Sequence, residues 1–255
     1  MSFKIAVAGK GGCGKTSIAS LVIRYLKKNG KTPILAVDAD ANANLGESLG
    51  LKVGQTIGTI LDSFQHEKIK IPAGMTKDAY LEYKLNETIV ESQGLDLITM
   101  GRGQGPECYC YPNLILKKFI DELADNYAHV VMDNEAGMEH LSRKTTENVD
   151  VLLLVSNHSV KGIRSVRRIL DLVNELKLSI SEKLLIINLA PDTIDPLVDN
   201  ELKQAGLKPD IIIPEDKVLY RYDLEQKPLT EMPDNSQAVQ AIQRLMSQIN
   251  RHWSN

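Results

Sequence analysis

Short apolar runs alternate along the chain with longer stretches in which apolar residues recur every three or four positions. The first apolar run, residues 4–8, is followed by residues 17–29, which have helical spacing. Runs of the same kind occur at residues 33–37, 95–100, 129–132, 151–155, 184–187 and 210–213. Continuous apolar strands are typical of a parallel sheet covered on both faces, and the intervening helices provide the crossover connections. The pattern predicts an α/β fold with three layers, a mostly parallel sheet with helices on both faces.

The pattern changes in two places. Between residues 50 and 94 it loosens into Lys- and Glu-rich helical pieces around Leu61 and Leu81, and we expect an insertion there that recognises a partner. Residues 238–253 place apolar side chains on one stripe of a helix but include few basic residues, which favours a helix packed on the core over one that binds a membrane. No Pro-, Gly- or Ser-rich linker divides the chain, so we expect residues 1–255 to form one domain.

The most informative motif is GKGGCGKTS at residues 9–17, which we call the P-loop. It fits the phosphate-binding pattern G-x-x-x-x-G-K-[ST] in the strand–loop–helix context that the pattern requires. Glycines let the backbone N–H groups point at phosphate oxygens, Lys15 neutralises the β- and γ-phosphates, and Thr16 ligates Mg²⁺. The residues expected to bind the nucleotide here are Gly11, Gly12, Cys13, Gly14, Lys15, Thr16 and Ser17. The motif predicts binding and hydrolysis of ATP; the alternative is a glycine-rich turn in a sugar-phosphate or dinucleotide enzyme.

A second lysine, Lys10, lies inside the loop. Its side chain projects away from the phosphate cradle, but it can cross a two-fold axis to the nucleotide of a facing subunit. With this lysine the motif resembles the deviant Walker A family of ATPases, which includes the nitrogenase iron protein, MinD and the partition ATPases. The resemblance implies a homodimer that forms with ATP, in which Lys10 and Lys15 are catalytic. The alternative is that Lys10 is a solvated loop lysine.

Two carboxylates, Asp38 and Asp40, follow the second predicted strand at the edge of the sheet where ligands collect. In one loop they can divide the work, one holding Mg²⁺ through water and the other orienting the attacking water. The family resemblance places Asp38 nearer the metal and gives Asp40 the water-activating role, as in switch I. The alternative is an Asx turn, in which the side chain bonds only to nearby backbone.

A third aspartate, Asp133, ends the apolar strand at 129–132, and Gly137 follows four residues later. The Asp133 carboxylate is expected to ligate a Mg²⁺-bound water, and the Gly137 amide to sense the γ-phosphate. This segment resembles switch II of the same family. A simple turn that ends the strand is the alternative.

Two later strand ends are candidates for the nucleotide base. Asn188 offers an amide that can both donate to and accept from an adenine edge, and Pro214 and Glu215 offer backbone groups in a fixed turn. In relatives the corresponding residues contact adenine, so the resemblance gives this role to Asn188, Pro214 and Glu215. An ordinary turn asparagine is the alternative. The guanine signature Asn/Thr-Lys-x-Asp is absent, which favours ATP over GTP.

Cys108 and Cys110 form a C-x-C pair. On extended backbone both sulfurs point to the same side and can share one metal ion. A tetrahedral Zn²⁺ or a square-planar Ni²⁺ needs four ligands, which a two-fold dimer provides by bringing two such pairs together on its axis. The alternative is that both cysteines serve as small buried hydrophobic residues.

Together these segments resemble the accessory ATPases of the CooC and AcsF type, which assist nickel insertion into carbon monoxide dehydrogenase and acetyl-CoA synthase. The resemblance is carried by GKGGCGKTS, VDADANANLG, the C-Y-C sequence and MDNEAGMEHLSR. It implies a nickel-binding maturation factor that dimerises with ATP and has one of these nickel enzymes as its client. Two other functions stay open: a MinD-type positioning ATPase, and an ATP-driven electron donor with an iron–sulfur cluster at the C-x-C pair.

Composition and charge indicate which kinds of partner the protein binds and in which cellular compartment we expect it. The chain of 255 residues has a formal net charge of −3, which does not favour nucleic acid or an anionic membrane as a partner. Three cysteines do not suggest a disulfide framework, and no apolar run approaches the ~18 residues of a membrane span. The first strand begins too early to leave room for a signal peptide, so we expect a cytoplasmic protein. Against the overall charge, the helical stretch 161–177 bears Lys161, Arg164, Arg167 and Arg168, and we interpret it as a solvated face or a partner contact.

Overall fold

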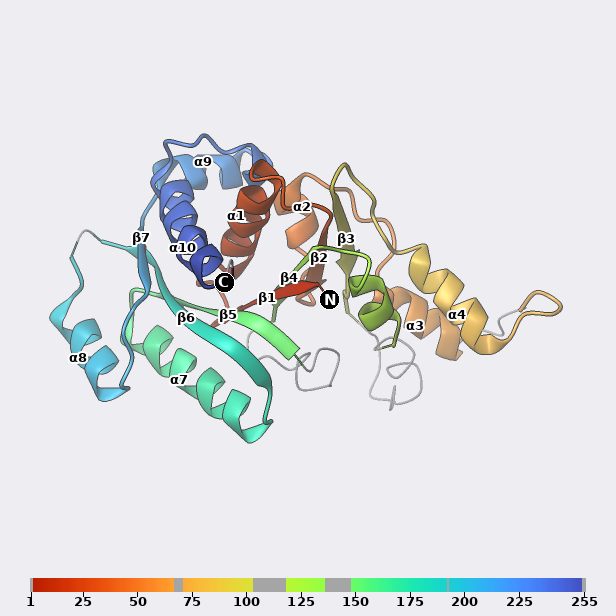
Figure 1. Cartoon of the computed structure of the whole chain (residues 1–255), viewed down its shortest axis with the longest axis horizontal. Helices are drawn as coiled ribbons and strands as arrows, with labels where there is room; N and C mark the ends of the chain where they lie inside the picture. The colour runs from red at the N-terminus through yellow and green to blue at the C-terminus, as the bar shows by residue number, and fades with distance from the viewer. Residues whose placement is uncertain (1, 67–70, 103–117, 136–147, 192, 254–255) are drawn as a thin grey trace.

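The strands form one parallel sheet, as the apolar runs predict. The computed structural model describes residues 2–66, 71–102, 118–135, 148–191 and 193–253. Within these residues seven strands lie in the order β3-β2-β4-β1-β5-β6-β7, and all neighbours pair in parallel (Figure 1). The strands are β1 Phe3–Gly9, β2 Ile34–Ala39, β3 Leu95–Thr99, β4 His129–Asn134, β5 Asn148–Asn157, β6 Ser179–Ala190 and β7 Ile211–Pro214.

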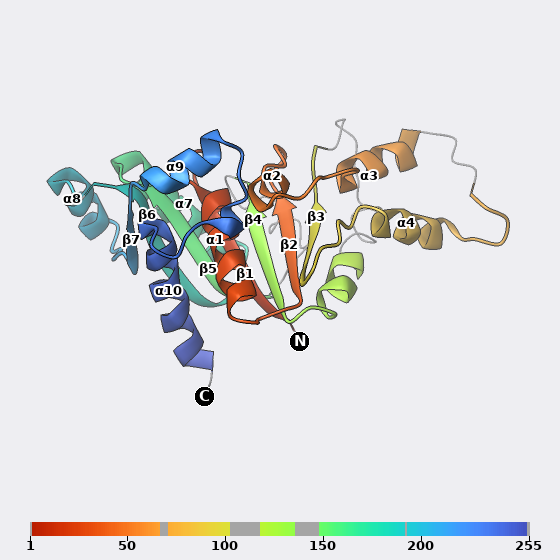
Figure 2. The ribbon, with the colours of Figure 1, turned by 90° about the horizontal axis from the view of Figure 1, so that it is seen from above.

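Helices cover both faces of the sheet and bury two apolar cores (Figures 1 and 2). One face carries α1 Lys15–Lys28, α2 Leu45–Leu49, α9 Lys217–Leu224, the short helix η1 Leu229–Glu231 and α10 Gln237–Trp253. The other carries α7 Val160–Glu175 and α8 Pro196–Gln204, with α3 Ile57–His66 and α4 Lys77–Asn86 beside the β3 edge. The predicted helix–sheet–helix layering is therefore confirmed.

The last helix, α10, packs against α1 and β7. The side chains of its apolar stripe are each at most 2% exposed: Val239, Ile242, Leu245, Met246 and Ile249. This confirms the prediction of a helix that packs on the core. Among the described residues, no helix has both the length and the apolar character needed to cross a membrane.

The structure differs from the sequence prediction at β6, which begins at Ser179, five residues before the predicted strand. Its first residues alternate between exposed and half-buried positions, so they lack the continuous apolar run used to find the other strands. Helices α3 and α4 do form between residues 50 and 94, where the sequence predicts helical pieces. Their role in recognising a partner stays a prediction.

Candidate ATP-binding site

The P-loop joins β1 to α1 and leaves the start of α1 open to a ligand. Gly12 and Gly14 have φ angles of 76° and 89°, a left-handed conformation that favours glycine. A Cβ atom on Gly9 would lie 2.2 Å from the carbonyl oxygen of Val155, so this position also requires glycine. In the described structure no side chain caps α1 and its first turn holds no acidic residue. The N-terminus of α1 can therefore receive an anion such as phosphate.

The side chains of the loop divide into buried and exposed groups. Lys15 is only 7% exposed, whereas Lys10 lies on the surface. Cys13 is buried, and its thiol donates a hydrogen bond to the carbonyl oxygen of Val155 at 3.2 Å. Burial raises the pKa of this thiol above its ordinary value, so Cys13 stays a neutral packing group. Only the backbone of Cys13 is available to a nucleotide.

Thr16, in the first turn of α1, and Asp133, on β4, are in direct contact beside the P-loop. The Thr16 hydroxyl donates a hydrogen bond to Asp133 Oδ2 at 2.6 Å. The other oxygen, Asp133 Oδ1, is buried and has no hydrogen-bond partner among the described residues. Burying a carboxylate oxygen without a partner costs free energy. A cation bound to this oxygen directly or through water would remove that cost.

Asp38 supplies a second carboxylate at the same place, because Asp38 on β2 pairs in register with Asp133 on β4. Burial raises the pKa of Asp38 to about 6. Burial also raises the pKa of Asp133 to about 7, with the charge of Asp38 as a further cause. Two carboxylates and a hydroxyl are oxygen donors of the kind that Mg²⁺ prefers, so Thr16, Asp38 and Asp133 fit this ion.

The loop after β2 contains the Asx turn that was one interpretation of Asp38 and Asp40, and it also leaves a carboxylate oxygen for the ligand that the other interpretation requires. Asp38 is fully buried and accepts hydrogen bonds from the amides of Asp40 at 3.2 Å and Leu45 at 2.8 Å. Asp40 is half-buried, and its Oδ1 accepts from the Asn42 amide at 2.9 Å, which forms an Asx turn. Oδ2 of Asp40 accepts no hydrogen bond from the described residues. The turn therefore holds Asp40 in place while leaving one oxygen for a ligand.

A cavity of about 490 Å³ adjoins the P-loop and contains the three residues predicted to contact the base. Its lining includes Gly12, Gly14, Ser17, Asn188, Leu189, Pro214, Glu215, Asp216 and Tyr220. The amide of Asn188 has a second partner that the sequence analysis missed: its Nδ2 donates to the carbonyl oxygen of Cys13 at 2.9 Å. Asn188 therefore supports the P-loop backbone as well as facing the cavity.

Asp216 is a further residue that the sequence analysis missed. Its Oδ1 accepts from the Val218 amide at 2.7 Å and caps α9. Its Oδ2 accepts from the Ser236 hydroxyl at 2.6 Å and the Ala238 amide at 2.9 Å at the start of α10. One carboxylate thus ties both helices beside the cavity. Its position at a helix start is a local signal for a cap, but its bonds to α10 have no local signal.

Cys108, Cys110 and Gly137 lie outside the described residues, so the C-x-C metal site stays a prediction. In the part of the chain that the structure describes, no group of three or more His, Cys, Asp or Glu side chains could hold a metal ion.

Comparisons with known proteins agree with this geometry. A family profile described as "AAA domain" matches residues 3–186. An uncharacterized ATP-binding protein of Methanocaldococcus jannaschii is 41% identical over 247 residues, 96% of this chain and 97% of that protein. The carbon monoxide dehydrogenase accessory protein CooC of Rhodospirillum rubrum is 28% identical over 184 residues, 68% of this chain and 70% of that protein.

Solved structures give the same answer for the fold. The septum site-determining protein MinD of Pyrococcus horikoshii, solved as a complex with Mg-ADP, superposes with a TM-score of 0.70 at 21% identity. The match covers 98% of this chain and 96% of that protein. A ParA family ATPase of Chlorobium tepidum superposes with a TM-score of 0.71 at 21% identity, over 95% of this chain and 97% of that protein. The chain therefore belongs to the AAA domain family of P-loop ATPases and has the fold of the MinD and ParA proteins.

Proposed function

We propose that this protein hydrolyses ATP as a homodimer and uses the reaction to insert nickel into a client enzyme. The observation that carries the ATPase part lies beside the P-loop, where half-buried Thr16 bonds to buried Asp133 and Asp133 Oδ1 has no partner among the described residues. Mg²⁺, when bound, supplies charge that stabilises the transferring phosphoryl group, and Thr16, Asp38 and Asp133 are the residues that hold it.

The other residues of the site act on the phosphates and on water. Lys15 is buried, and because water screens its charge less there, its attraction to the β- and γ-phosphate oxygens is stronger. Asp40 orients a water molecule through its second oxygen, so that the water attacks the γ-phosphorus while the bond to the ADP oxygen breaks. Asn188, Pro214 and Glu215 hold the adenine in the cavity beside the loop.

Lys10 completes the site from the facing subunit. It lies on the surface of the loop, where it can reach a second copy of the chain. A cation brought to the γ-phosphate only in the dimer stabilises the transition state without strengthening ground-state binding, as an arginine finger does. ATP binding, dimerisation and hydrolysis are therefore coupled.

The nickel part of the proposal rests on sequence. Cys108 and Cys110 of two subunits provide four thiolates for one Ni²⁺, or for Zn²⁺ in vitro, and this metal is cargo. The similarity to CooC supports carbon monoxide dehydrogenase or acetyl-CoA synthase as the client. We place the protein in the cytoplasm, where thiols stay reduced and can take up metal.

A MinD-type positioning ATPase is the second candidate, favoured by the superposition on MinD along nearly the whole chain. Nickel titration by equilibrium dialysis, with the mass measured in solution, separates the candidates. The proposal predicts one Ni²⁺ per dimer, lost in Cys108→Ser and Cys110→Ser. Binding to anionic liposomes without nickel binding would support the positioning role instead. Visible absorption of anaerobically purified protein would indicate an iron–sulfur cluster and an electron donor.

A further inference from the structure

The groove between α7 and α8 gathers positive charge away from the P-loop. It has a volume of about 580 Å³ and is lined by Arg164, Arg167, Arg168, Glu201, Gln204 and Ala205. Both helices lie on the face of the sheet opposite α1 and α10 (Figure 1). Three arginines in one groove contrast with a chain whose formal net charge is −3.

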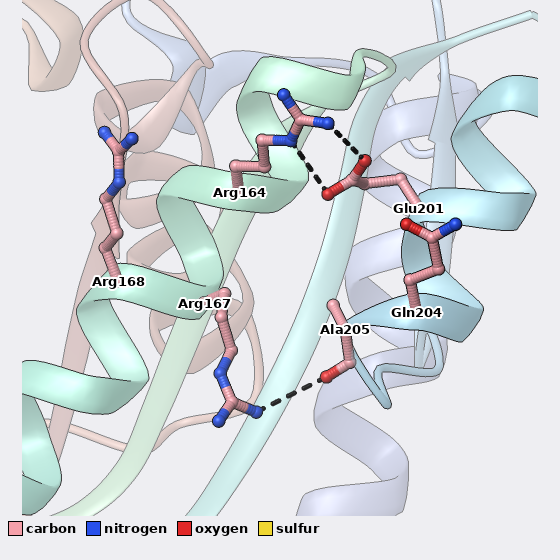
Figure 3. Close-up of a pocket in the computed structure, with 6 residues that line it drawn as sticks. All are labelled: Arg164, Arg167, Arg168, Glu201, Gln204 and Ala205. Carbon is pink, nitrogen blue, oxygen red and sulfur yellow. Dashed lines mark hydrogen bonds and ion pairs between the residues drawn. The ribbon is translucent and has the colours of Figure 1, made fainter.

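Two of these arginines are held in place by neighbours (Figure 3). Nε and Nη2 of Arg164 donate to the two carboxylate oxygens of Glu201 at 2.9 and 3.0 Å. Arg167 donates to the carbonyl oxygen of Ala205 at 3.4 Å and forms an ion pair with Asp171 at 3.2 Å. A guanidinium has five N–H donors, so Arg164 keeps three for a ligand in a fixed orientation. Such preorganisation lowers the entropy lost when a ligand binds.

Two cations on α7, Arg168 of the groove and Lys161 one turn before Arg164, are not paired with acidic side chains. The side chains of Lys161 and Arg168 are exposed and form no ion pair with any described residue. Lys161 stands in the first turn of α7, which contains no acidic residue. A cation there is unfavourable because the helix dipole already places positive charge at this end. A negatively charged ligand would offset the charge of Lys161, which the helix does not stabilise, and that of Arg168.

We propose that the α7–α8 groove docks an acidic segment of a partner protein. Glu201 occupies one edge of the Arg164 guanidinium, and the remaining N–H donors of Arg164 can bind a carboxylate of the partner. Lys161 and Arg168 attract further Asp or Glu side chains along α7. We favour a protein over nucleic acid because the net charge of −3 repels a phosphate backbone, whereas a short acidic segment meets only the groove. The proposal does not rest on nickel binding, since these residues belong neither to the P-loop nor to the C-x-C pair.

The test measures binding of a fluorescein-labelled hexaglutamate peptide to the full chain by fluorescence anisotropy at low salt. The groove variant Lys161→Gln/Arg168→Gln is compared with a matched control, Lys27→Gln/Arg244→Gln. The control removes two exposed charges from α1 and α10 on the opposite face. We expect the groove variant to bind about tenfold more weakly and the control to change binding less than twofold. Equal losses in both variants, or no binding to the unmodified protein, would overturn the proposal.

Two more measurements distinguish specific recognition of a carboxylate by Arg164 from non-specific electrostatic attraction of the peptide. Arg164→Lys keeps the charge but removes the planar fork, so the proposal predicts about threefold weaker peptide binding, whereas simple attraction predicts no change. A hexathymidylate oligonucleotide serves as the competing ligand. If it binds more tightly than the peptide and loses affinity in the groove variant, the groove binds nucleic acid and the proposal is wrong. ATP hydrolysis, measured in parallel, should be unchanged in every variant.

Discussion

Replacing Asp133 by asparagine should stabilise the nucleotide-free protein at pH 8 while it abolishes ATP hydrolysis. Asp133 is buried beside Asp38, and its pKa is raised from 3.8 to about 7. The folded protein therefore holds this proton more tightly than the unfolded chain. Stability from this group is greatest below about pH 4 and is lost as the pH rises toward 7.

The size of the effect follows from that difference in pKa. Holding Asp133 ionised in the fold costs about 4 kcal/mol at pH 8 relative to the unfolded chain. Asparagine removes the charge and can still accept a hydrogen bond from the Thr16 hydroxyl. It leaves a buried N–H group unpaired, which costs about 2 kcal/mol. The net gain is about 2 kcal/mol, or a melting temperature higher by about 5 °C in a protein of this size.

Thermal unfolding by circular dichroism, without Mg²⁺ or nucleotide, at pH 5 and pH 8 measures this gain. Asp133→Asn should show its advantage at pH 8 and little of it at pH 5. Asp216→Asn is the matched control: partial burial raises the pKa of Asp216, but hydrogen bonds, chiefly from the Ala238 amide, outweigh this and lower it. Its ionised form is stabilising, so Asp216→Asn should unfold at lower temperature at pH 8. An Asp133→Asn protein that is less stable than the unmodified chain at pH 8 would refute the reasoning.

Five other substitutions test three separate parts of the account. Asp40→Asn and Lys10→Ala should each abolish hydrolysis but leave ATP affinity within about threefold, because neither group cradles the ground-state phosphates; turnover and a nucleotide titration measure both. Cys110→Ser should remove nickel in equilibrium dialysis, while Cys13→Val should retain it, since that thiol is buried against a β5 carbonyl. Gly9→Ala should destabilise the fold by about 3 kcal/mol in urea unfolding, because its Cβ would lie 2.2 Å from the same carbonyl oxygen; an unchanged midpoint would contradict this.

The sequence predicts those parts of the site that depend on local chemistry. The P-loop pattern fixes the turn from β1 into α1, and the apolar runs place Asp38 and Asp133 at strand ends. Their direct pairing could not be predicted, because it depends on the order β2-β4-β1, which is set by tertiary packing. Burial raises the pKa of both carboxyls, and the charge of Asp38 raises the pKa of Asp133 further.

Contacts between distant segments account for most of what the sequence analysis missed. Asn188 bonds to Cys13 across 175 positions, and Asp216 bonds to Ser236 across 20. An asparagine after a strand or an aspartate before a helix gives a local signal only, so the second partner of each residue is visible only in the fold. The prediction for α10 succeeded because one apolar stripe of a helix is itself a local pattern.

The central claim is that two subunits complete one ATPase site, and mixing two inactive variants tests it most directly. In a dimer of one Lys10→Ala and one Asp40→Asn subunit, the first keeps its own Asp40 and receives Lys10 from the second. After subunit exchange at equal concentrations, half of the dimers are mixed and each has one complete site. The account predicts that the mixture regains about a quarter of the unmodified turnover. A mixture that stays as inactive as its two components would contradict it.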